Sequence, residues 1–216
     1  LKNNEAMMWF SKLYDLSLTL NEDHYIARAL VLISTIFDMN GDHEIAIDYA
    51  KKSLKLCSGE MEKTDVADVY MNYGLLLDHS GLHGESLTAF QLAVKYYRQV
   101  EGHETYLNYS VTLFNLGKAL LALNRYDEAK SYVDEAMTIA QANDMLGYFS
   151  RGMKMIADFY AKAGEFIRAN ELLNGYFQYH QEVSRMRIKS IAGKHRDEFK
   201  PHFDSMHHLY QTNTQL

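Results

Sequence analysis

Residues 113–136 read LFNLGKALLALNRYDEAKSYVDEA, two amphipathic stretches on either side of the polar turn Asn124-Arg125-Tyr126. Apolar residues in each stretch recur every three or four positions, which predicts helices. Gly117 and Ala129 contribute small side chains to the two stretches, and small residues let two helices approach closely where they cross. The stretch therefore predicts a helical hairpin.

The pattern of this hairpin recurs along the chain. In four copies a turn residue precedes a small residue by five positions: Gly41 and Ala46, Gly81 and Ser86, Asn124 and Ala129, Gly164 and Ala169. Another small residue lies seven positions before each turn, at Ser34, Gly74, Gly117 and Ala157. The turn residues are 40, 43 and 40 positions apart. A partial copy, formed by Ala6, Phe10 and Leu13, opens the sequence, so we expect it to begin inside a repeat.

The sequence permits long helices, because its single proline is Pro201. Strand-like alternation of polar and apolar residues is absent. We expect an all-α fold of about four and a half helical hairpins that ends in a long helix. The expected helices lie near residues 4–20, 23–39, 43–57, 62–80, 83–101, 104–123, 126–142, 145–163 and 166–199.

The repeats resemble the tetratricopeptide (TPR) family. The copy that matches best consists of Leu113, Leu116-Gly117, Leu120, Ala129, Val133 and Ala136, and the next consists of Tyr70, Tyr73-Gly74, Leu77, Ser86, Phe90 and Ala93. The period exceeds the usual 34 residues of this family, which we interpret as longer helices. The resemblance covers residues 1 to about 180 and implies a right-handed α-α superhelix, a TPR-like solenoid.

We expect two parts, a solenoid over residues 1–180 and a helical stalk over residues 181–216 that breaks near Pro201. The residue before a proline is biased out of the α region, which predicts the break. The stalk resembles in layout the helix that follows TPR sensor regions in bacterial signalling proteins such as diguanylate cyclases. Its apolar seam, with Met186 and Ile191, predicts that it packs against a second copy or leads into a further domain.

First helices of successive hairpins line the concave groove of such a solenoid, which suits a protein or peptide ligand. The expected groove residues are Met71, Asn72, Leu75, Phe114, Asn115, Lys118, Arg151 and Lys154, with Arg28, Val31, Leu32, Thr35 and Asp158 on the same face. Asn72 and Asn115 occupy equivalent places, and each amide can donate to and accept from a peptide backbone. Lys118, Arg151 and Lys154 would form a positive spot for a carboxylate.

Residue patterns typical of catalysis are missing from the sequence, which has no nucleophile elbow, phosphate-binding loop or dinucleotide fingerprint. We therefore expect no enzymatic activity of this segment and no cofactor. Ten histidines are present, the densest group being His202, His207 and His208, but zinc-binding spacing is absent, so we expect no metal site. No apolar run approaches the length of a membrane span. A single cysteine, Cys57, is consistent with a reducing compartment, the cytoplasm.

Three functional hypotheses follow from these patterns. The first is a sensor or interaction module of a bacterial signalling protein whose output domain lies outside this segment. The second is a free-standing adaptor, or a peptide-responsive transcriptional or assembly regulator. The third is a nucleic-acid-associated or assembly factor, and a contact with nucleic acid is suggested by six basic and two acidic residues within 185–200. The remaining chain is acidic and would repel phosphate, so nucleic acid is the least favoured partner.

The apolar seam of the stalk gives a first prediction. Replacing Met186→Glu together with Ile191→Glu should leave helicity nearly unchanged but lower self-association, because the seam would carry charges. Sedimentation velocity of the parent and the double variant measures the effect. A monomeric parent with the same sedimentation profile as the variant would contradict the prediction.

Overall fold

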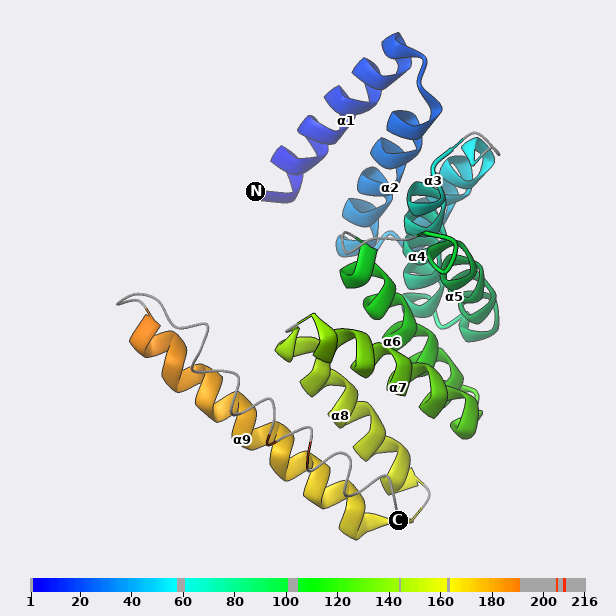
Figure 1. Ribbon diagram of the computed structural model, residues 1–216. Helices are drawn as coiled ribbons and strands as arrows, with labels where there is room; N and C mark the ends of the chain where they lie inside the picture. Colours follow the sequence, from blue (N-terminus) through cyan, green and yellow to red (C-terminus); the bar gives the residue numbers. More distant parts are fainter. Residues whose placement is uncertain are drawn as a thin grey trace. The chain divides into compact units, whose positions relative to one another are not determined.

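The computed structural model describes residues 2–57, 61–100, 105–143, 145–162 and 164–190, together with Ser205 and His208. Within these residues the chain forms nine helices and no strand (Figure 1). The helices are α1 (Lys2–Leu20), α2 (Asp23–Met39), α3 (His43–Leu56), α4 (Lys63–His79), α5 (His83–Tyr97), α6 (Tyr106–Ala122), α7 (Tyr126–Ala142), α8 (Leu146–Lys162) and α9 (Phe166–Ser190).

This architecture confirms the all-α prediction. In sequence order, α1 is followed by four pairs of helices, as the repeat pattern predicts. Most helix ends lie within two residues of their expected positions. The largest difference among the described residues is at α5, which ends at Tyr97 rather than at residue 101. The expected extension of α9 to residue 199 lies outside the described residues, since α9 is described to Ser190.

Each pair of helices is joined by a turn whose central residue has a left-handed backbone. The φ angles are +89° at Gly41, +76° at Gly81 and +83° at Gly164, and Asn124 takes the equivalent place with a φ of +59°. Glycine adopts this conformation without a steric penalty, and asparagine tolerates it better than most residues. After Gly41, the amide of Asp42 donates to the carbonyl of Phe37 at 2.9 Å, which closes the end of α2.

The small residues of the repeat are withdrawn from solvent. They are buried in every repeat, at Ser34, Gly74, Gly117 and Ala157 in the first helices and at Ala46, Ser86, Ala129 and Ala169 in the second helices. The approach is close at Gly74 of α4, where an added Cβ would lie 2.7 Å from two ring carbons of Phe90 in α5. Phe90 is fully buried. The glycine therefore makes room for the phenyl ring.

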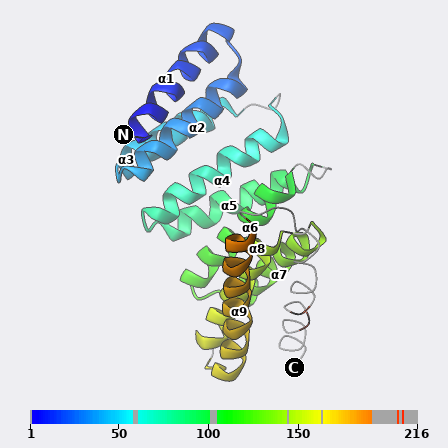
Figure 2. The same cartoon turned by 90° about the vertical axis from the view of Figure 1, so that its left-hand side faces the viewer.

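The chain divides into two compact units, Leu1–Asn124 and Arg125–Leu216. In the first unit each helix from α1 to α5 packs against the next one, and α4 and α5 lie side by side in Figure 2. In the second unit α8 packs against α7 and α9. The boundary that we expect near residue 180 falls within α9 and stays a prediction. Pro201, Ile191 and the side chain of Met186 lie outside what the structure describes.

The crossing of α4 and α5 gives a stability prediction. Gly74→Ala should lower the free energy of unfolding by about 1 to 3 kcal/mol, because the buried ring of Phe90 must shift. Gly84→Ala is the matched control, since Gly84 lies near the start of α5 with open space around a new Cβ. This control should be neutral or stabilise the fold by up to about 1 kcal/mol. Equal denaturation midpoints for the two variants would contradict the crossing described above.

Candidate functional site

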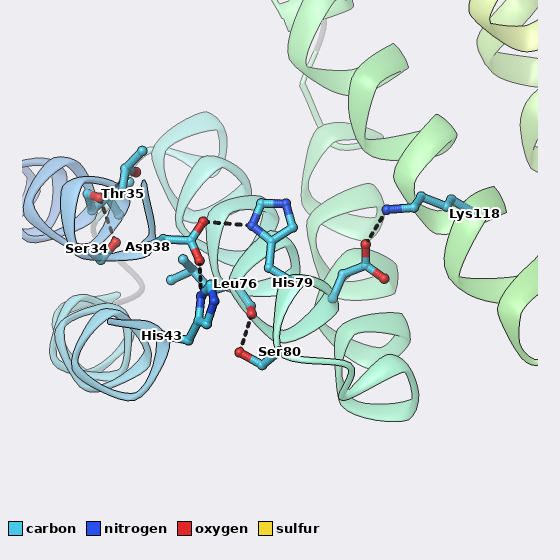
Figure 3. Close-up of polar contacts among 10 residues, drawn as sticks. Ser34, Thr35, Asp38, His43, Leu76, His79, Ser80 and Lys118 are labelled. Carbon is cyan, nitrogen blue, oxygen red and sulfur yellow. Dashed lines mark hydrogen bonds and ion pairs between the residues drawn. The ribbon is translucent and has the colours of Figure 1, made fainter. Parts of the chain in front are cut away.

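The first helices of the hairpins in the unit Leu1–Asn124 form a series in which α2 contacts α4, and α4 contacts α6. Near the end of α2, the carboxylate of Asp38 accepts two hydrogen bonds. One comes from Nδ1 of His43, in the second helix of the same hairpin, at 2.8 Å, and the other from Nδ1 of His79, in α4, at 2.7 Å. Figure 3 shows Asp38 between the two imidazole rings. Asp38 therefore links its own hairpin to the next one.

Asp78, forty residues later, also accepts two hydrogen bonds and links its own hairpin to the next one. Its carboxylate accepts a hydrogen bond from Nδ1 of His83 at 2.9 Å and one from Nζ of Lys118, in α6, at 2.7 Å. Burial of Asp78 opposes its ionisation, but the hydrogen bonds and charges of Lys118 and His83 outweigh this effect and lower the pKa of its carboxyl. The pair connects α4 to α6.

These links were not foreseen from the sequence, although the repeat contains a signal for them. Asp38 and Asp78 each lie three positions before the turn glycine, and His43 and His83 each lie two positions after it. An aspartate and a histidine five positions apart, repeated across a turn, are placed to pair. The partners in the next hairpin, His79 and Lys118, are not at equivalent positions, so the repeat gives no signal for them.

A third polar contact lies nearer the start of α4. The carboxylate of Asp68 accepts hydrogen bonds from the hydroxyl of Tyr97, in α5, and from Nδ2 of Asn108, in α6, at 3.0 Å. Burial and then the neighbouring Asp68 carboxylate raise the pKa of the Tyr97 hydroxyl. Tyr97 therefore stays protonated and serves as a donor. This contact joins α4, α5 and α6.

Two of the expected groove residues lie in the core. Phe114 is 1% exposed, and Met71 is 9% exposed and packs against Ala67, Ala93 and Tyr97. Neither side chain is available to a ligand, which corrects their expected place on the groove surface. Because both side chains are buried, the apolar stripes of α4 and α6 are wider than the sequence pattern suggested.

Asn72, Leu75 and Asn115 are half-buried and remain candidates. Nδ2 of Asn72 donates to the backbone carbonyl of Asp68, one turn earlier in α4, at 2.8 Å. This bond occupies one of its two amide protons and leaves its oxygen to accept. The Asn115 amide makes no hydrogen bond to any described residue. The two amides lie on α4 and α6, which are neighbours.

The expected positive spot is only partly described. Lys118 is exposed, but Asp78 already compensates its charge. Lys154 lies in the other unit, on α8, with Nζ 5.9 Å from the ring centroid of Tyr176. The side chain of Arg151 is outside the described residues, and a spot formed jointly by residues of both units stays a prediction.

The remaining expected groove residues are spread over α2 and α8. Arg28 and Thr35 are exposed on α2, where Val31 and Leu32 are half-buried, and Asp158 is exposed on α8. The Thr35 hydroxyl donates to the carbonyl of Val31 at 3.0 Å, so it is occupied within its own helix. On α2 the exposed side chains of the expected face are therefore those of Arg28 and Thr35.

Chemistry-bearing groups are sparse in the described part of the chain. No three of its histidine, cysteine, aspartate or glutamate residues are grouped so that they could hold a metal ion. None of the described helices combines the length and the apolar character needed to cross a membrane. Burial, and then Asp65, raise the pKa of the Cys57 thiol to about 11, so this cysteine is a thiol and not a thiolate at neutral pH.

Paired helices with small residues at their crossings, a period of about forty residues and polar links between successive first helices define an α-helical repeat protein of the solenoid class. The model of the tetratricopeptide repeat family matches residues 65–142, which include α5, α6, α7 and all but the first two residues of α4. No curated protein is similar enough in sequence to count as a relative.

Several solved structures share the fold. BtubC (BKLC) from P. vanneervenii has a TM-score of 0.71 and 14% identity, over 98% of this chain and 84% of that one. A putative kinesin light chain from Podosopora anserina with TPR-like repeats has a TM-score of 0.66 and 12% identity, over 85% and 89%. PlcR from Bacillus thuringiensis, solved with the peptide PapR7 and DNA, has a TM-score of 0.60 and 14% identity, over 88% and 70%. At these identities the similarity concerns the fold alone, a TPR-like solenoid.

The lowered pKa of Asp78 gives a prediction about pH. A carboxyl whose pKa is lower in the folded state stabilises the fold above its unfolded pKa of about 3.9, and this contribution disappears as pH falls through the folded pKa. Asp78→Asn should therefore lower the free energy of unfolding by about 1 to 2 kcal/mol at pH 7. The difference from the parent should shrink below about pH 4.

Urea titrations at pH 7 and pH 3 measure this difference. Asp48→Asn, at an exposed position of α3 without a hydrogen-bond partner among the described residues, is the control and should change stability little at either pH. An Asp78→Asn effect of the same size at both pH values would contradict the assigned role of the carboxylate.

Proposed function

We propose that this chain is a protein- or peptide-binding module that takes an extended peptide segment along the first helices α4 and α6. The observation that carries the proposal is the half-buried amide of Asn115, which has no hydrogen-bond partner among the described residues. A polar group that is partly withdrawn from water and has no internal partner is suited to bind a ligand.

The chemistry of the face matches a peptide backbone. The Asn115 amide offers a donor and an acceptor, which complement a backbone carbonyl and a backbone N–H. The Asn72 oxygen adds an acceptor on the neighbouring helix, since its nitrogen already donates to Asp68. Leu75 contributes apolar surface on the same helix as Asn72. Backbone recognition through amides is insensitive to the ligand sequence, so selectivity would come from apolar and charged neighbours.

The comparisons support this reading at the level of the fold. PlcR, which shares the fold at low identity, was solved with a bound peptide. The tetratricopeptide repeat match includes both asparagines, which lie within residues 65–142. Helical-repeat solenoids bind partners on extended surfaces formed by successive repeats, and the polar links at Asp38, Asp68 and Asp78 would hold such a surface in a fixed shape.

The proposal extends to the biological context of the binding module. We propose a sensor or interaction region of a bacterial signal-transduction protein in the cytoplasm, with any catalytic output domain outside this segment. The alternative is a free-standing adaptor or a peptide-responsive regulator. Self-association through the stalk belongs to both versions. Reading the complete gene would separate them, because only the first version requires an output domain in the same polypeptide.

A peptide-display library tests the binding face directly. Peptides of random sequence would be selected on the parent chain, and the tightest one synthesised. Asn115→Ala should weaken its binding by about 5- to 150-fold, because losing one amide from a desolvated contact costs about 1 to 3 kcal/mol. Asn170→Ala, at an exposed position of α9, is the matched control and should bind like the parent.

Isothermal titration calorimetry of the three proteins with the same peptide measures the effect. A second comparison uses His207→Ala with His208→Ala, which removes two of the C-terminal histidines. If Asn115→Ala binds as tightly as the parent while the histidine variant loses binding, the α4 and α6 face is not the site.

A further inference from the structure

Asp65 lies in the first turn of α4, on the same side of the helix as Asn72. The two residues are seven positions apart, close to two full turns, so their side chains project in nearly the same direction. Asp68 lies between them and accepts a hydrogen bond from Asn108, which shows that this side of α4 faces the next first helix, α6. Asp65 is therefore in line with one of the two amides to which we assign peptide binding.

The Asp65 carboxylate has no bonding partner among the described residues. It is half-buried, and it forms neither a hydrogen bond nor an ion pair with any of them. The other two aspartates of α4, Asp68 and Asp78, each accept two hydrogen bonds. A carboxylate that is partly withdrawn from water and unpaired is unfavourable until a cation or a hydrogen-bond donor reaches it.

The charges near Asp65 do not supply such a partner. Burial raises the pKa of its carboxyl, and Arg28 of α2 lowers it but is too far from the carboxylate to form an ion pair. Asp68 and Glu62 raise this pKa further, and His24 lowers it. The pKa remains raised, so the nearby positive charges do not offset burial and the two acidic neighbours. A ligand that brings a cation would do so.

The first helices as a group have the same excess of negative charge. Residues 1–124 carry 16 acidic side chains and ten lysines and arginines. The first helices α2, α4 and α6 hold five aspartates against three basic residues, and one of these, Lys118, is already paired with Asp78. The second helices α3 and α5 hold three acidic and four basic residues. A ligand that approaches the first helices is therefore favoured when it is cationic.

We propose that the peptide bound along α4 and α6 carries an arginine or lysine whose side chain pairs with the Asp65 carboxylate. This inference rests on the proposed function and assigns a charge to its ligand. Asp65 and Asn72 are about 10 Å apart along the helix axis, so a ligand residue whose backbone lies at Asn72 reaches Asp65 with a long side chain. Arginine fits best, because both carboxylate oxygens are unoccupied and a guanidinium donates to two oxygens at once.

Parallel selections from one random peptide library test the charge of the ligand. Peptides selected on the parent should be enriched about fivefold in arginine and lysine at one position, the size expected for an ion pair partly exposed to solvent. Asp65→Asn should abolish this enrichment, and Asp65→Lys should select aspartate or glutamate at the same position. Asp23→Asn is the matched control, since Asp23 is exposed in the first turn of α2. Its selection should agree with that of the parent.

A double-mutant cycle measures the contact itself. Calorimetry would use one selected peptide and a version in which glutamine replaces the basic residue. Asp65→Asn and the peptide change should each weaken binding about three- to tenfold, and both together no more than either alone, because they remove the same ion pair. The denaturation midpoint of Asp65→Asn should not lie below that of Asp23→Asn. Both variants lose a favourable charge at the start of a helix, and Asp65 has no bonding partner to lose.

Two outcomes overturn this inference alone. In the first, the selected peptides lose affinity for Asn115→Ala but show no preference for basic residues. In the second, Asp65→Asn and the peptide change weaken binding independently of each other, or Asp65→Asn binds like the parent. If no peptide is selected, or if Asn115→Ala binds the peptides as tightly as the parent, the proposed function fails and the inference fails with it.

Discussion

The close packing of two helices at a residue with a small side chain or none is the constraint on which the hairpins depend. A Cβ at Gly74 would clash with the ring of Phe90, so the absence of a side chain lets α4 and α5 pack closely at this point. Small residues at the equivalent positions of the other repeats are buried in the same way. Once this crossing is fixed, the rotation of each helix about its axis is fixed as well, and with it the side chains that face the next hairpin.

The helices, the turns and the crossings could be predicted from the sequence, because local periodicity determines most of them. Each depends on residues within about forty positions of one another and recurs in every repeat. The surface of the first helices was harder to predict. Met71 and Asn72 are adjacent, but their side chains point about 100° apart around the helix. Which of the two is buried depends on a third helix, and periodicity within one helix does not report on it.

The polar links also divide into contacts that the local sequence predicts and contacts that depend on the packing of successive hairpins. The pairing of Asp38 with His43 is local to a turn, whereas its bond to His79 depends on how successive hairpins are rotated against each other. On α4 and α6, Asn72 and Asn115 lie in sequence between the contact of Asp68 with Asn108 and that of Asp78 with Lys118. A surface held at both ends loses little conformational freedom when a ligand binds, which favours affinity. The charge of Lys118, paired with Asp78, thus helps to hold the surface of α4 and α6 in place.

The repetition of Asp38 and Asp78 has a consequence for how such a chain can change its length. Removing residues 41–80 as a block would bring Gly81 directly after Asn40, so that α2 would be joined to α5. Asp38 would then meet His83 across the new turn, in place of His43, and Lys118 in the following helix, in place of His79. The Asp38 carboxylate would again accept two hydrogen bonds, from different donors. Units built in this way are interchangeable, so gene duplication or loss of a whole module can lengthen or shorten the protein without redesigning its junctions.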